Sequence, residues 1–158
     1  MKLYYDEDSN SGNGLSYPLC SSCIDLNTWT NILITYDFTS GGMITYINGE
    51  QEGSLILTSE RRDFSNINGY IVFGTFQSNN GSNQYYGNID EVAVWSTILS
   101  SNDIEGVYNN HYGHPNLENN VSFGDLEAYW RFNEGSGSSS SAEFDSDLDL
   151  TIINAEWQ

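Results

Sequence analysis

The strongest constraint on the fold of this chain is a repeated alternation of short β-type runs with clusters of Gly, Asn and Ser. Short runs rich in Val, Ile, Thr and aromatic residues, separated by turn-forming residues, are typical of an antiparallel sandwich or barrel. The candidate strands are residues 3–5, 29–36, 43–47, 54–57, 70–76, 86–95, 126–132 and 148–153. The pattern predicts an all-β fold, and a length of 158 residues suits one domain.

Two turn signals predict hairpins in the first half of the chain. Asn48 and Gly49 form a two-residue hairpin signal, because both residue types tolerate positive φ. The segment 37–42 ends in two glycines and predicts a second hairpin loop. In the strand before that loop, Ile32 and Ile34 share one face. We expect two adjacent antiparallel hairpins with a half-buried first strand.

One short helix is expected after the strand 86–95. Ser100 or Ser101 can cap it, and Asp103 lies three residues after Ser100 as in a capping box. An apolar stripe at i, i+3 and i+4 follows, formed by Ile104, Val107 and Tyr108. The helix is predicted to lie on the rim of the strands and to end near Gly113.

The charge balance argues against two classes of partner. Four Lys and Arg residues stand against 22 Asp and Glu residues, which gives a formal net charge of −18. This charge opposes approach to nucleic acid and to anionic lipid. No apolar run approaches the roughly 20 residues that span a bilayer, so membrane insertion is not expected. An acidic chain is, however, compatible with bound Ca²⁺.

Three motifs occur in a specific order and spacing. They are WTNILITYD at 29–37, YING at 46–49, and GNIDEVAVW at 87–95 followed by Leu99 and Ser100. The combination resembles the laminin G-like and pentraxin-type domains of the concanavalin A-like superfamily, over about residues 27 to 110. The resemblance implies an antiparallel β-sandwich with jelly-roll topology and one short rim helix.

The C-terminal region resembles a different part of the same family. AYWRFNEGSG at 128–137 and LDLTIINAEW at 148–157 are similar to the opening strand pair, which usually comes first. We therefore expect laminin G-like strands and the rim helix in residues 1–114, a linker at 115–125, and a C-terminal strand pair at 126–158. Because a sandwich without its opening strands exposes an apolar face and open edges, the pair should complete it, either in cis or in a neighbouring copy.

The resemblance implies a non-catalytic recognition or adhesion module that binds a glycan or a protein surface. Since this fold serves several functions, two alternatives stay open. One is a structural virion protein, such as a phage capsid decoration, tail or fibre component, that interlocks with copies of itself or with other virion proteins. The other is a glycoside hydrolase fragment. We expect the chain to act outside the cell or on a virion surface, and the chain as written shows no signal-peptide pattern.

The loop 77–86 has the composition of a shallow sugar site, in which aromatic rings and amide groups meet. Its candidate ligand-binding residues are Gln77, Asn79, Asn80, Asn83, Tyr85 and Tyr86. The same composition also fits an ordinary long hairpin loop.

Candidate Ca²⁺ ligands are oxygen donors near loop rims, since Ca²⁺ prefers carboxylate and amide oxygens. They are Asp6, Asp8 and Asn10 near the N-terminus and Asp90 in the family motif. Alternating carboxylates at 145–149 form another acidic cluster, and neither cluster has EF-hand spacing. The alternative for each cluster is a solvated acidic loop.

An enzyme is not expected. Glycoside hydrolysis needs two carboxyl groups about 5 to 9 Å apart across a sugar. Asp90 and Glu91 are adjacent, so in a regular strand they point to opposite faces unless a bulge intervenes.

Cys20 and Cys23 form a C-x-x-C pair without a following helix pattern, which argues against a thioredoxin-like site. Three interpretations remain: a local disulfide, two buried thiols, or a zinc site completed by His111 and His114.

Overall fold

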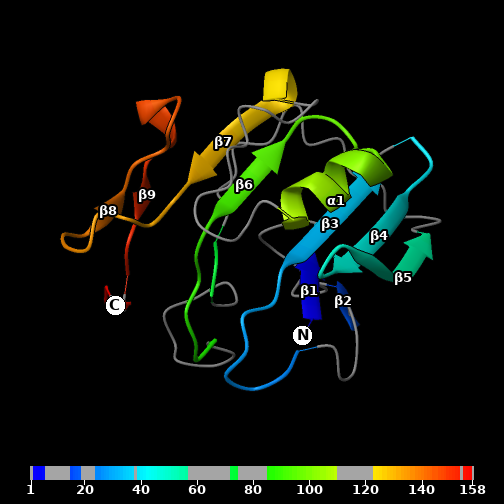
Figure 1. Ribbon diagram of the computed structural model, residues 1–158, viewed down its shortest axis with the longest axis horizontal. Coiled ribbons are helices and arrows are strands. Elements are labelled where there is room, and N and C mark those ends of the chain that lie inside the picture. Colours follow the sequence, from blue (N-terminus) through cyan, green and yellow to red (C-terminus); the bar gives the residue numbers. More distant parts are fainter. Residues whose placement is uncertain are drawn as a thin grey trace. The chain divides into compact units, whose positions relative to one another are not determined.

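The computed structural model describes residues 2–5, 15–18, 24–37, 39–56, 72–74, 85–109, 123–153 and 155–157 (Figure 1). The chain divides into two compact units. Unit 1 comprises residues 1–71 and 98–120, and unit 2 comprises residues 72–97 and 121–158. Each unit thus combines two separate stretches of the chain. The predicted segment boundaries, with a linker at 115–125, stay a prediction.

Antiparallel strands are the main regular structure among the described residues. The strands are β1 (Lys2–Tyr5), β2 (Leu15–Pro18), β3 (Ile32–Asp37), β4 (Gly42–Ile47), β5 (Glu50–Ile56), β6 (Val92–Trp95), β7 (Leu126–Trp130), β8 (Ser139–Ser140) and β9 (Leu150–Thr151). The helical elements are α1 (Ser101–Asn109) and two 3₁₀ turns, η3 (Phe123–Asp125) and η4 (Ser146–Leu148). Every strand pairing is antiparallel. The predicted content of antiparallel strands with one short helix is thus confirmed for the described part of the chain.

Three strand assignments differ from the sequence prediction, and one of them is β8, which lies in a serine-rich segment that was not predicted as a strand. Within the predicted strand 70–76, residues Val72–Gly74 are described and do not form a strand. The remainder of that run lies outside the described residues. Strand β2 was not predicted, because LSYP ends in a proline and stands among Gly and Ser residues that favour turns.

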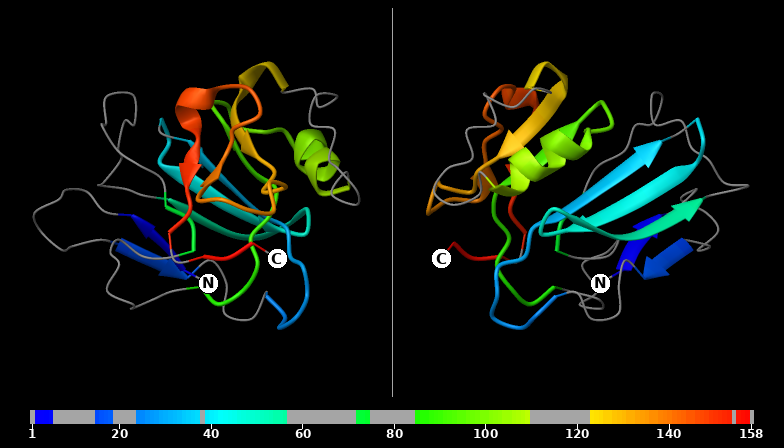
Figure 2. Two further views of the ribbon diagram at one scale, coloured as in Figure 1. Left: turned by 90° about the vertical axis from the view of Figure 1, so that its left-hand side faces the viewer. Right: turned by 45° about the vertical axis from the view of Figure 1, so that its right-hand side comes forward.

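In unit 1, β3, β4 and β5 form a three-stranded sheet in chain order, side by side in both ribbon views (Figures 1 and 2). The predicted Asn48–Gly49 turn joins β4 to β5, and both residues have positive φ, 52° and 82°. The loop between β3 and β4 is closed by Asp37, whose carboxylate accepts hydrogen bonds from Thr39 N at 2.8 Å and Ser40 Oγ at 2.6 Å. Local sequence signals therefore specify both hairpins.

The burial of β3 corrects one expectation. The buried face carries Leu33 and Thr35, whereas Ile32 and Ile34 are each 37% exposed. Both faces of this strand carry apolar residues, so alternation alone does not decide which face is covered. On the central strand β4, the buried side chains are Met43, Thr45 and Ile47.

Helix α1 begins as predicted at a capping box. Ser100 Oγ donates to Asp103 Oδ2 at 2.6 Å, and Asp103 N donates back to Ser100 Oγ at 3.3 Å. Ile104 is buried, and the Tyr108 ring packs against Gly49, where a Cβ would lie 3.0 Å from Tyr108 Cδ1. The helix therefore packs on the turn between β4 and β5. No helix among the described residues is both long and apolar enough to cross a bilayer.

In unit 2, β6 pairs with β7, and β8 pairs with β9. Trp130 at the end of β7 is only 4% exposed, and its Nε1 donates to Leu148 O at 2.9 Å. The Phe73 ring meets it edge-on with centroids 6.0 Å apart. Strand β7 belongs to the segment predicted to fold back or to exchange with another copy, and here it pairs with β6 of its own chain. Completion of a sandwich by this segment stays a prediction.

Candidate functional site

The first candidate site is the tyrosine surface, defined as Tyr85 and Tyr86. Tyr85 N donates to Gly74 O at 2.7 Å, which brings Tyr85 of the predicted sugar-binding loop next to Gly74, three residues before that loop begins. Tyr85 is 54% exposed and Tyr86 is 88% exposed. The other predicted ligand-binding residues, Gln77, Asn79, Asn80 and Asn83, lie outside the described residues. The structure thus presents the aromatic half of the predicted site to solvent.

The Tyr85 ring lies close to Gly87. A Cβ at residue 87 would stand 2.5 Å from Tyr85 Oη and 2.6 Å from its Cζ. The ring therefore occupies the space that any other side chain at residue 87 would need. The Tyr85 ring thus lies close to the backbone of Gly87 and remains half exposed.

The structure gives the Asp90 carboxylate a local role. Glu91 N donates to Asp90 Oδ1 at 3.1 Å, and Asp90 is exposed. The described residues contain no group of three or more His, Cys, Asp and Glu side chains arranged to hold a metal ion. The other predicted Ca²⁺ ligands, Asp6, Asp8 and Asn10, lie outside the described part of the chain. Ca²⁺ binding stays a prediction.

The acidic cluster at 145–149 also satisfies backbone groups. Asp145 Oδ1 accepts a hydrogen bond from Asp147 N at 2.9 Å, and Asp149 Oδ1 accepts one from Ala142 N at 3.0 Å. These hydrogen bonds shape the turn around η4, and they give two carboxylates of the cluster a backbone partner.

Glu91 is turned toward the partner strand. Its φ is 53°, in the left-handed region, so the regular alternation of side chains is interrupted here. The Tyr129 hydroxyl donates to Glu91 Oε2. Burial and this neighbouring carboxylate raise the pKa of Tyr129 well above its ordinary value, so the phenol stays protonated. Glu91 and Asp90 thus each accept a hydrogen bond from within the protein.

The predicted cysteine pair also falls outside the described residues. Cys20 and Cys23, and the two histidines of the zinc alternative, His111 and His114, are all in undescribed segments. The choice among a disulfide, free thiols and a zinc site stays open.

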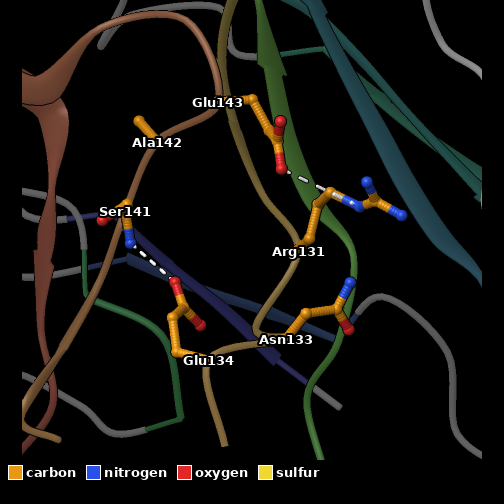
Figure 3. A pocket seen from close by; sticks show the side chains of 6 residues that line it. All are labelled: Arg131, Asn133, Glu134, Ser141, Ala142 and Glu143. Carbon is orange, nitrogen blue, oxygen red and sulfur yellow. Dashed lines mark hydrogen bonds and ion pairs between the residues drawn. The ribbon is translucent and has the colours of Figure 1, made fainter.

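A second candidate site was missed by sequence reasoning. It is the polar pocket, a hollow of about 370 Å³ in unit 2 (Figure 3). Its lining residues are Arg131, Asn133, Glu134, Ser141, Ala142 and Glu143. The sequence gives only a partial signal, which is a group of polar residues directly after strand β7 and before a serine-rich segment.

Backbone pairing fixes the two walls of the polar pocket. Trp130 forms a bridge with Ala142, and Glu143 N donates to Tyr129 O at 2.9 Å. This register places Glu143 opposite Tyr129, and Arg131 lies diagonally across from Glu143, with Arg131 Nε 3.9 Å from Glu143 Oε1 (Figure 3). Both side chains are partly exposed.

Glu134 is held by the serine-rich loop. Its Oε1 accepts hydrogen bonds from Ser141 N at 2.8 Å and from the buried Ser140 Oγ at 2.9 Å. Partial burial opposes ionisation, but the hydrogen bonds outweigh it and keep the pKa of Glu134 below its ordinary value. The pocket therefore contains one ionised carboxylate with fixed partners and one ion pair.

Comparison with known proteins identifies the family. A family model described as the concanavalin A-like lectin/glucanases superfamily, of the laminin G type, matches residues 5–105, which is more than half of the chain. No curated protein and no solved structure matches the chain.

Proposed function

We propose, since this chain belongs to the concanavalin A-like lectin/glucanase superfamily, that it is a non-catalytic module that recognises a glycan or a protein surface. The family match supports carbohydrate or protein binding at this coarse level. The architecture that we propose is the β-sandwich jelly roll of that superfamily, and the antiparallel strand pairs support it. Of the two ligand classes, we favour a glycan.

The exposure of the tyrosine surface carries this choice. Tyr86 is almost fully exposed, and Tyr85 rests on Gly87 with half of its surface in water. Sugars present apolar C–H faces that stack on aromatic rings, together with hydroxyl groups that need polar partners. The sequence between Gly74 and Tyr85 is rich in Asn and Gln, whose side chains carry such polar groups.

The test is affinity electrophoresis of the full chain in gels that contain one defined polysaccharide each. We expect wild type to be retarded by at least one glycan, and Tyr85→Ala and Tyr86→Ala to weaken binding about tenfold. Leu26→Ala is the matched control, because Leu26 is 91% exposed and lies in unit 1. Equal retardation of all variants would contradict the tyrosine surface as the binding site.

The same gels test the remaining expectations. If Ca²⁺ assists binding, EDTA should abolish retardation and added Ca²⁺ should restore it. A hydrolytic role would appear instead as shortening of the polysaccharide. A virion or other self-assembling role would appear as stable oligomers without any glycan in light scattering of the full chain.

A further inference from the structure

We propose that the polar pocket is a second sugar-contacting site and that it selects neutral sugars over acidic ones. This inference rests on the proposed glycan-binding function and adds the class of sugar. It concerns residues 131–143, which the sequence analysis did not select, and its variants are separate from those of the tyrosine surface.

The size and construction of the polar pocket suit a sugar unit. A volume of about 370 Å³ lies at the lower end of the range for small-ligand sites. Its walls are tied by backbone pairing between the end of β7 and residues 142–143. Glu134 and the buried Ser140 brace the loop beside it. The polar groups are therefore positioned without a ligand, which lowers the entropic cost of binding.

The lining chemistry matches a pair of neighbouring hydroxyl groups. Arg131 supplies hydrogen-bond donors and Glu143 supplies acceptors, and the two side chains lie side by side. Asn133 adds an amide that can donate and accept. Because each sugar hydroxyl both donates and accepts, adjacent donors and acceptors recognise it better than a site of one kind alone.

The charge of the polar pocket disfavours acidic sugars. One guanidinium stands against the carboxylates of Glu134 and Glu143, so the lining is net negative when both are ionised. The hydrogen bonds to Glu134 hold its pKa low, so it stays ionised at neutral pH. The formal net charge of −18 adds a long-range repulsion of anions. A neutral sugar meets the same hydrogen-bonding groups without this repulsion.

The experiment uses the full chain in gels of neutral glucan, neutral mannan, neutral galactan, polygalacturonate or heparin. We expect retardation in at least one neutral gel and none in the acidic gels. Arg131→Gln and Glu143→Gln should each weaken binding about tenfold, because each leaves a hydroxyl without its charged partner. Glu127→Gln is the matched control for Glu143→Gln, since it makes the same charge change at an exposed position of β7. Circular dichroism checks that each variant is folded.

Two results separate this inference from the proposed function. If the pocket variants bind like wild type while Tyr86→Ala loses binding, the polar pocket is not a sugar site and the glycan-binding function stands. Stronger retardation by polygalacturonate or heparin than by any neutral gel would overturn the neutral-sugar selection. If no gel retards wild type, this inference fails, and the proposed function is then judged on protein ligands.

Discussion

The sheet β3-β4-β5 and the strand pair β6-β7 differ in how far apart along the chain their paired strands lie. The first three strands are consecutive and are joined by short turns. Strands β6 and β7 are separated by residues 96–125, and Trp130 reaches forward to Leu148. Both candidate binding sites lie in unit 2. Local signals thus specify the sheet of unit 1, and tertiary packing positions the candidate binding groups.

The largest expected effect tests the long-range packing in unit 2. Trp130→Ala removes a buried ring that meets Phe73 and Leu148, and should lower the free energy of unfolding by about 3–5 kcal/mol. Trp29→Ala is the control, because the same change at a largely exposed tryptophan should cost about 0.5 kcal/mol or less. Urea unfolding measures both, and equal losses would show that Trp130 is not a core residue of unit 2.

The next effect tests whether local sequence signals specify the sheet of unit 1. Gly49→Ala places a Cβ at φ 82° and against Tyr108, and should destabilise the chain by roughly 1–2 kcal/mol. Gly106→Ala in α1 meets nothing within 4 Å and should instead stabilise it by about 0.5–1 kcal/mol. Thermal unfolding compares the two variants. A Gly49→Ala protein as stable as wild type would mean that the Asn48–Gly49 turn does not set the hairpin.

Gly87→Ala separates binding from stability. The flexible Tyr85 ring can swing away from a new Cβ, so we expect a stability change of about 0.5 kcal/mol or less. The displaced ring should nevertheless weaken glycan binding several-fold in the gel assay. Unchanged binding would show that the resting position of Tyr85 on Gly87 has no part in recognition.

The smallest effect is a pH dependence at the polar pocket. Since the hydrogen bonds from Ser141 and Ser140 lower the pKa of Glu134, this carboxylate stabilises the fold at pH values above the ordinary pKa of 4.5. That contribution is lost as the pH falls through the lowered value. Glu134→Gln should therefore flatten this part of the stability–pH curve, measured by urea unfolding between neutral and acidic pH. An unchanged curve would show that the carboxylate contributes nothing.

Features with short sequence separation could be predicted. The Asn48–Gly49 turn needs positive φ at two residues, and the Ser100–Asp103 capping box needs two side chains three residues apart. Each is visible in a few consecutive letters. The exposed Tyr85 and Tyr86 were predicted in the same way, from a loop with aromatic and amide residues.

Features that depend on long-range packing could not be predicted. Which face of β3 is buried depends on what covers it, and Ile32 and Leu33 are equally apolar. The polar pocket forms because Tyr129 and Trp130 pair with residues 142–143, and no local sequence pattern predicts that pairing. The positive φ of Glu91, which turns its side chain toward Tyr129, was likewise not predictable, because residue 91 is neither glycine nor asparagine.

The most direct test of glycan recognition at the tyrosine surface is an NMR titration of the tyrosine-labelled chain. The titrant is a neutral oligosaccharide derived from the polysaccharide that retards wild type, and Tyr85→Phe and Tyr86→Phe assign the two sets of ring signals. We predict that the ring signals of Tyr85 and Tyr86 shift in proportion to occupancy. Ring signals of both residues that stay unchanged at saturating sugar would contradict the account.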